Sequence, residues 1–304
     1  MAISKKTVFI IIAFFAIYVI WGSTYLLNKV AVTELPPFFL ASLRFLTAGI
    51  IIFIIFKFLK LNLAITRKQF LNCTIAGVLF LVYGNGVFVW ALKYVDSGFG
   101  ALEASTQPLF VLLLMKLIDG KKMQTSSIIG VIFGVIGMYI LVSQRELVTQ
   151  EGTLLGMFMI LTCVLSWSYG SVFVSKADLP KNYFVSAAYQ MITSGILLII
   201  TSMVLGESWI SPSEWSEPVA WSMILLALFG SVVAFTSFNY LLKMVSPEKV
   251  STSAYVNPVI AIVLGWYVLD EVISLQTIIA ATILLTGVYF ITTKRKIKIR
   301  PFGR

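Results

Sequence analysis

The chain has 304 residues, of which 59% are hydrophobic and only 12% are charged, and its mean hydropathy is +0.96. Charged residues make up about a quarter of an ordinary soluble domain, so the composition excludes such a domain and predicts an integral membrane protein. The net charge of +10 would also suit a nucleic-acid-binding protein, but the positions of the basic residues explain it without that partner.

Ten apolar segments are long enough to cross a bilayer, for which a helix needs about 20 residues. In chain order they are predicted at 7–27, 35–56, 69–92, 97–118, 125–143, 153–174, 183–205, 219–242, 248–269 and 273–293. The expected fold class is an all-α integral membrane protein with ten transmembrane helices and short loops. The first segment follows Lys5 and Lys6, as a secretory signal would, but it is long and lacks a small-x-small cleavage pattern, so we expect it to be retained.

The basic residues are concentrated in alternate loops. The N-terminus, the even-numbered loops and the C-terminus contain 19 of the 23 Lys and Arg residues, whereas the odd-numbered loops contain three. Because cytoplasmic loops carry the excess of basic residues, both termini are predicted to be cytoplasmic. The expected partner of this charge is the head-group region of the lipid bilayer, and no nucleic acid is expected.

An internal repeat divides the chain in two. Residues 91–141 align with residues 241–291 at a constant offset of 150, which places Gln107-Pro108 on Asn257-Pro258. The predicted units are 1–147 and 148–293, with five spans each, followed by a basic cytoplasmic tail, 294–304. Because five is odd, the second unit is expected to be inverted relative to the first, as in many transporters.

The aligned prolines predict a break in the fourth and ninth spans. Proline lacks an N–H and clashes with the preceding turn, so Pro108 and Pro258 should each leave backbone carbonyls without partners. Within a bilayer such carbonyls are tolerated where protein or a watered cavity surrounds them. We therefore expect a central cavity flanked by both prolines, with kinks that serve only helix packing as the alternative.

Two ionisable side chains, Arg44 and Glu103, lie well within the apolar spans, at similar depths. Charged groups at such depth are costly and are functional by default. Glu103 is a candidate to exchange a proton or to bind a cationic substrate group, while Arg44 adjusts its charge or holds a carboxylate. The alternative is a permanent ion pair between the two. Their repeat counterparts, Gln190 and Ser253, are neutral.

Further polar and aromatic residues are expected at the depth of the cavity. Rings and amides together describe a moderately polar, adaptable pocket, although single rings more often serve helix packing. The candidates are Tyr83, Asn85, Gln107, Trp167, Tyr169, Asn239, Tyr255 and Asn257. Besides the two prolines, Trp21 and Gly22 near the end of the first span are candidates for gating.

The remaining motifs indicate structure. Cys73 and Cys163 lie in apolar spans and form no motif, and the chain has no His, so neither a metal site nor another cofactor is expected. The fifth span carries Gly130, Gly134 and Gly137, a small-residue face that lets membrane helices approach closely. We expect this face to serve packing or a homodimer contact.

A further set of motifs is distributed over both halves: Trp21-Gly22-Ser23-Thr24-Tyr25, Pro36-Pro37-Phe38, Leu43-Arg44-Phe45, Pro108, Gly130, Gly137, Trp167, Pro258 and Asp270-Glu271. Together these motifs resemble the drug/metabolite transporter superfamily, specifically its EamA-type permeases. The resemblance covers about residues 5–293, and Glu103 departs from it because an apolar residue is usual there. It implies two inverted five-helix bundles, a cavity lined mostly by spans one, three, four, six, eight and nine, and export of small organic solutes.

The function expected from the sequence is secondary active transport across the cytoplasmic (inner) membrane. The substrate would be a small amino-acid-like or amphipathic metabolite, moved outward by alternating access, with the proton as the coupling ion. One alternative is an anion exchanger of the sugar-phosphate or nucleotide-sugar type. Others are a membrane enzyme acting on lipid-linked substrates, which this chain's lack of His and of clustered acids disfavours, and a channel-like scaffold.

Overall fold

The computed structural model describes residues 5–120, 124–143 and 151–292. Within these ranges the chain is helical, without a strand. We use α for α-helices and η for π-helical and 3-10 segments. The first half contains α1 (Lys5–Phe15), η1 (Ala16–Ile20), α2 (Trp21–Ala31), α3 (Pro37–Phe58), α4 (Arg67–Gly77), η2 (Val78–Val87), α5 (Phe88–Ala91), α6 (Ser97–Ala104), α7 (Gln107–Asp119) and α8 (Thr125–Val142).

The second half has a matching order of elements. It contains α10 (Thr153–Lys176), α11 (Tyr183–Val204), η3 (Pro212–Glu214), α12 (Glu217–Leu225), η4 (Leu226–Phe235), α13 (Thr236–Met244), α14 (Pro247–Val250), η5 (Ser251–Tyr255), α15 (Asn257–Leu269) and α16 (Leu275–Thr292). In the described part of the chain, 8 helical runs are long and apolar enough to cross a membrane, and α8 and α16 are shorter apolar helices. All ten predicted segments are therefore helical, and eight meet the length requirement.

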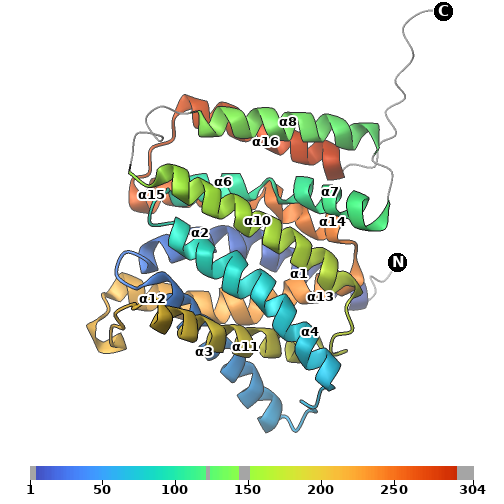
Figure 1. Ribbon diagram of the computed structural model, residues 1–304, viewed down its shortest axis with the longest axis vertical. Coiled ribbons are helices and arrows are strands. Elements are labelled where there is room, and N and C mark those ends of the chain that lie inside the picture. Colours follow the sequence, from blue (N-terminus) through green and yellow to red (C-terminus); the bar gives the residue numbers. More distant parts are fainter. Residues whose placement is uncertain (1–4, 121–123, 144–150, 293–304) are drawn as a thin grey trace, which may run out of the picture.

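The helices lie in layers. α8 and α16 run side by side at one edge of the molecule, and α3 and α11 run side by side towards the opposite edge (Figure 1). Between them, α10 packs on η2 and α15 packs on α2 and α6. Fully buried Phe45, Phe80 and Phe235 belong to the apolar core.

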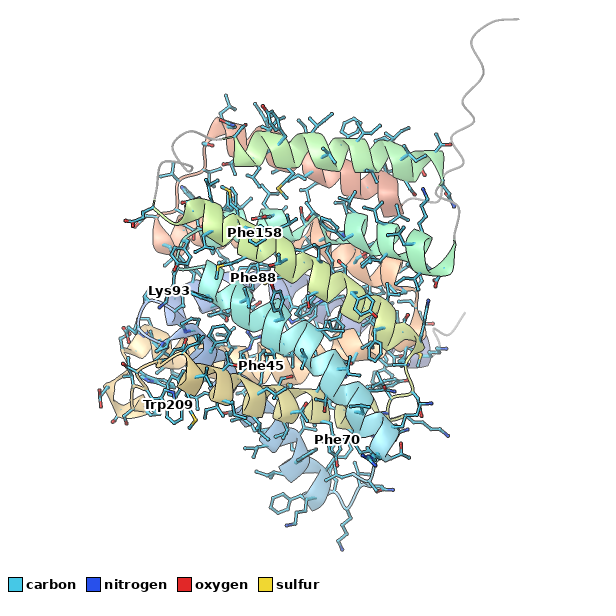
Figure 2. The ribbon with its side chains drawn as sticks, in the orientation of Figure 1. Phe45, Phe70, Phe88, Lys93, Phe158 and Trp209 are labelled. Atoms are coloured by element: carbon cyan, nitrogen blue, oxygen red, sulfur yellow. The ribbon has the colours of Figure 1, made fainter. Side chains whose placement is uncertain are left out.

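Many large apolar side chains point outward. Phe15 and Phe158 are 63% and 64% exposed, and Figure 2 labels Phe158 on α10. A soluble protein rarely leaves so much apolar surface in contact with water. Because a bilayer provides an apolar surrounding, these side chains are suited to contact lipid.

Both predicted proline breaks are present. In the fourth span α6 ends at Ala104, and α7 begins anew with Pro108 in its first turn. In the ninth span the 3-10 segment η5 precedes α15, which has Pro258 in its first turn. Proline suits this place because the first turn of a helix has no intrahelical partner for the missing N–H.

The spans also contain π-helical segments that the sequence analysis did not predict: η1, η2 and η4. A π-helical turn is wider than an α-helical one, is rare, and occurs frequently at functional sites. It shifts carbonyl oxygens out of the usual hydrogen-bond ladder. Some of these oxygens accept from side chains of other helices, as Leu79 O does from Ser166 Oγ at 2.8 Å.

Candidate functional site

A cavity of about 110 Å³ lies among the broken and π-helical segments. A site of this size can hold several water molecules or a small organic solute. Two of its lining residues, Phe45 and Phe88, lie in the middle part of the bundle in Figure 2. Phe70 and Trp209, which do not line the cavity, lie near the periphery of the bundle. The wall is formed by Trp21, Thr24, Tyr25, Asn28, Arg44, Phe45, Leu81, Gly84, Asn85, Phe88, Ala101, Ala104, Ser105, Gln107, Cys163, Val164, Trp167, Gly230, Phe235, Ser253, Ala254, Asn257 and Pro258.

Helical periodicity decides which residues of the third span line the cavity. The lining positions Leu81, Gly84, Asn85 and Phe88 follow the i, i+3, i+4, i+7 spacing of a single helix face. Tyr83 lies two positions from both Leu81 and Asn85, so it points to the opposite side. It is 43% exposed and does not line the cavity.

Two further predicted site residues do not line the cavity, and the side chain of a third is not among those that the structure describes. Tyr169, two positions after the lining residue Trp167, is 46% exposed for the same periodic reason. Asn239 is buried outside the wall, where its Oδ1 accepts from Gln190 Nε2 at 2.8 Å and its Nδ2 donates to Phe235 O at 3.1 Å. The side chain of Tyr255 lies outside the described residues.

Two tryptophans meet at the centre of the wall. The indole rings of Trp21 and Trp167 lie edge to face with centroids 5.7 Å apart. Nε1 of Trp21 donates to Gly230 O in η4 at 3.1 Å, and both indoles pack against Phe238. Gly22, a predicted gating residue, is buried outside the wall against Ile260 of α15.

The amides at the proline breaks have different roles. Asn257 faces the carbonyl oxygens of Ile17 and Tyr18 in η1, at 3.1 and 2.8 Å, when its nitrogen is the donor, so it satisfies carbonyls released by a π-helical turn. Gln107 lines the cavity, and so does Pro258, whereas Pro108 is buried outside the wall. Each break therefore contributes a side chain to the cavity.

Arg44 lines the cavity and is only 3% exposed. Its Nε donates to Ser231 Oγ at 2.9 Å, and its Nη1 donates to Asn28 Oδ1 at 3.3 Å. Its guanidinium carbon lies 5.0 Å from the centroid of the Phe45 ring. No carboxylate among the described residues lies within ion-pair distance of Arg44.

The alternative of an Arg44–Glu103 ion pair is therefore wrong. α3, which carries Arg44, packs on α11 and η4, whereas α6, which carries Glu103, packs on α15 and α10. Glu103 is 3% exposed, lies outside the cavity wall, and is near Cys163, which lines the wall. Its Oε2 is buried without a hydrogen-bond partner.

Several residues of the site were missed by the sequence analysis. Asn28 and Ser231 hold Arg44, and Gly230 leaves room for it: a methyl group there would lie 3.1 Å from Arg44 Nη2. Asn85, which was predicted, lines the cavity with its Oδ1 buried and unpartnered. A polar amide four positions after Thr24 on the Trp-Gly-Ser-Thr-Tyr helix was the available signal for Asn28.

At one end of the bundle, polar contacts join four spans. Nζ of Lys29 donates to Leu92 O and Val95 O at 2.7 Å each, and the Glu271 carboxylate accepts from Ser97 N at 2.7 Å and from Gly98 N at 3.0 Å. A carboxylate suits these unsatisfied N–H groups at the start of α6. We call Lys29, Asp96 and Glu271 the polar cluster.

Asp96 is the third member of this cluster. Its partial burial raises the pKa of its carboxyl group above the usual value, and the nearby Glu271 charge raises that pKa further, while Lys29 acts in the opposite direction. At the other end of the same span, Asp119 forms an ion pair with Lys176 of α10. Nζ of Lys243 donates to Ala177 O at 2.7 Å beside it.

The chain is similar to known proteins over nearly its whole length. It matches the EamA-like transporter family twice, over residues 8–143 and 154–293. The "Uncharacterized inner membrane transporter YedA" of Escherichia coli (strain K12) is 36% identical over 290 residues, which are 93% of this chain and 92% of the relative. The "Uncharacterized transporter YoaV" of Bacillus subtilis (strain 168) is 22% identical over 291 residues, covering 95% of this chain and 99% of the relative.

A solved crystal structure supports the fold. It superposes with a TM-score of 0.69 at 17% sequence identity and covers 94% of this chain and 96% of its own. The apolar helices, together with the similarity to the inner membrane transporter YedA, place this chain in the inner membrane as a multi-pass protein. The family matches and the near full-length relatives together show that the chain is a membrane transporter that belongs to the EamA-like transporter family.

Proposed function

We propose that the chain is a secondary transporter that moves a small organic metabolite across the inner membrane by alternating access. The observation that carries the proposal is the cavity between the broken helices, to which both breaks contribute Gln107, Asn257 and Pro258. A cavity at the interface of two repeats, lined by discontinuous helices, is the usual place for a substrate in transporters of this architecture. Export is the direction that the family resemblance implies.

The two halves are proposed to be inverted repeats of five spans with both termini in the cytoplasm. The two family matches, one per half, support the repeat. So do the paired π-helical segments η2 and η4 and the paired proline breaks. The charge distribution along the sequence supports the orientation.

The contacts beyond the cavity support two gates. Along the third span Phe80 precedes the lining residues, and along the eighth Phe238 follows them, so both rings lie toward the proposed cytoplasmic side, with the Lys176–Asp119 pair beyond. The polar cluster lies on the opposite side. Breaking one set of contacts while the other holds would expose the cavity to each side in turn.

Proton coupling is proposed to act through Glu103. A charged carboxylate without a partner is costly in an apolar surrounding, whereas the protonated acid is far less so. Its buried, unpartnered Oε2 and its position next to Cys163 would let a change in the hydration of the cavity change its charge. Binding of a cationic substrate group is the other role that an unpaired acid could have.

The lining supports an amino-acid-like or amphipathic substrate. The wall contains six aromatic residues and a single basic side chain, Arg44. It also contains four side-chain amides, those of Asn28, Asn85, Gln107 and Asn257. Carriers of sugar phosphates or nucleotide sugars must balance two or more negative charges, which one guanidinium cannot do. The anion-exchanger alternative is therefore less well supported.

Counterflow in proteoliposomes tests the proposal. Vesicles that contain the purified protein are loaded with one unlabelled L-amino acid, and uptake of the same labelled compound is measured for each common amino acid in turn. We expect saturable counterflow for at least one of them, and none in protein-free vesicles. Absence of counterflow across the whole set, or unsaturable ion currents in its place, would contradict the proposed transport.

A further inference from the structure

The guanidinium of Arg44 is a positive charge held inside the membrane without a neutralising partner. Among the described residues the ion-pair contact is between Lys176 and Asp119, at the edge of the bundle, and no acid pairs with Arg44. An unpaired charge at this depth is expensive, and such residues typically mark binding sites. The free energy lost by burying Arg44 would be recovered if a ligand supplied the missing negative charge.

The protein holds the guanidinium at two of its three nitrogens and leaves the third, Nη2, free. Ser231 binds Nε and Asn28 binds Nη1, whereas Nη2 has no partner among the described residues. Nη2 lies against Gly230, in the cavity wall. Because a guanidinium matches a carboxylate in charge and donates to its oxygens, the free Nη2 is suited to bind one.

Other groups of the wall complement the rest of such a ligand. Asn85 presents a buried amide oxygen, Oδ1, to which no described residue donates. An unpartnered acceptor of this kind is costly unless a ligand donates to it, and an ammonium or hydroxyl group would do so. The rings of Trp21, Trp167 and Phe88 provide apolar surface for a side chain.

We propose that Arg44 forms a subsite for a single carboxylate, so that the transported compounds are small monocarboxylates with an apolar portion, amino acids among them. This inference rests on the proposed function and names its substrate class. One guanidinium balances one carboxylate, whereas a phosphate monoester would leave an excess negative charge in the membrane. The subsite therefore selects carboxylates over phosphates and over the corresponding neutral amides.

Thermal stabilisation of the detergent-purified protein measures binding without requiring transport, since a ligand that binds the folded state raises the unfolding temperature. The probes are the common L-amino acids, the carboxamide of each, and glycerol 3-phosphate. We expect at least one amino acid to stabilise the protein, and its carboxamide to bind about tenfold to a hundredfold more weakly, as loss of a charge-assisted hydrogen bond implies. Stabilisation by none of the amino acids, or stronger stabilisation by the phosphate, overturns the proposal.

Two variants assign the effect to Arg44. Arg44→Gln should bind an amino acid and its carboxamide equally, because the charge that distinguishes them is gone. In Asn28→Asp a carboxylate oxygen should take the place of Asn28 Oδ1, 3.3 Å from Nη1. This carboxylate would neutralise the guanidinium in place of the ligand. Asn28→Asp retains Arg44 and gives it a charge partner, so it tests the subsite even if Arg44→Gln does not fold. It should lose the preference for carboxylates.

Lys57→Gln, which removes the same charge from the exposed end of α3, is the matched control and should keep that preference.

The outcomes separate this inference from the proposed function. A carboxylate preference that depends on Arg44, without counterflow in proteoliposomes, would support the subsite and contradict transport. Counterflow of an amino acid with an unchanged carboxylate preference in both Arg44→Gln and Asn28→Asp would support transport and contradict the subsite.

Discussion

Trp21 and Trp167 meet edge to face, with ring centroids 5.7 Å apart and ring planes at 84°. Trp21 lies in the first span of the first half, and Trp167 lies in the first span of the second half. Each also lies against a glycine in a π-helical segment of the other half: Trp21 donates to Gly230 O, and a methyl group at Gly84 would lie 3.0 Å from the Trp167 ring. Reciprocal contacts of this kind are what an inverted repeat would require.

The Trp21 indole is predicted to stabilise the fold through this hydrogen bond. Trp21→Phe keeps an aromatic ring but removes the donor to Gly230 O, and an unsatisfied buried carbonyl costs about 1–3 kcal/mol. The unfolding midpoint of the detergent-purified variant should therefore fall by several degrees. Trp221→Phe, at a position that is 57% exposed, serves as the control. Equal midpoints for the two variants would show that the bond contributes nothing.

Most of the fold could be predicted from the sequence, as the membrane spans show. Hydropathy located all ten helices because each needs a long apolar run, and the amide-proline pairs located both breaks because proline cannot continue a helix. The π-helical segments were not predictable, since a wider turn has no marker in composition. η2 reads as an ordinary apolar run in the sequence.

The site was only partly predictable, because the depth of a residue in the membrane does not say on which face of its helix the side chain lies. Arg44 and Glu103 have similar depths, yet Arg44 donates to residues of α2 and η4, whereas the helix that carries Glu103 packs mainly on α15 and α10. Tyr83 and Tyr169 have the right depth and face outward. Applying the helical period from Asn85 and from Trp167 would have excluded both tyrosines.

Gly230 is predicted to be required for transport because of the space it leaves. In Gly230→Ala the new methyl group would lie 2.9 Å from Thr24 Cγ2 and 3.1 Å from Arg44 Nη2, so it must displace the guanidinium. Counterflow should fall by at least about tenfold, the effect of roughly 1.4 kcal/mol. In Gly134→Ala the methyl group meets no atom of another described element within 4 Å, and counterflow should be unchanged. Similar losses in both variants would mean that Gly230 acts only through helix packing.

Glu103 is predicted to couple transport to protons. Glu103→Gln resembles the protonated acid in shape and cannot change charge, so counterflow should continue while the stimulation by a pH gradient disappears. The measurement compares uptake with and without an imposed gradient in the two proteins. A gradient dependence like that of the wild type would remove Glu103 from the coupling mechanism.

Asp96 is predicted to make stability depend on pH. Because its pKa is raised in the folded state, the folded protein binds more protons than the unfolded chain between the usual and the raised pKa, and stability is lost as pH rises through that interval. Asp96→Asn should therefore unfold at a higher temperature than the wild type at pH 8, and the difference should shrink as the pH is lowered towards 4.

The matched control for this comparison is Glu214→Gln, in an exposed part of the loop before α12. Its difference from the wild type should show no comparable trend with pH. If Asp96→Asn and the wild type unfold alike at every pH, burial and the Glu271 charge do not raise the pKa of Asp96 in the folded protein as inferred.

The central claim is that one cavity opens to each side of the membrane in turn, and the accessibility of Ala104 tests it most directly. Ala104 lines the cavity and is small, so Ala104→Cys, with Cys73 and Cys163 replaced by Ala, provides a single reactive thiol. A charged, membrane-impermeant thiol reagent should label it both in intact cells and in inside-out vesicles. Glu271→Gln should favour labelling from outside, and Asp119→Asn should favour labelling from inside. Ala76→Cys, buried away from the cavity, should stay unlabelled. Labelling of Ala104→Cys from one side only, in all three backgrounds, would contradict alternating access.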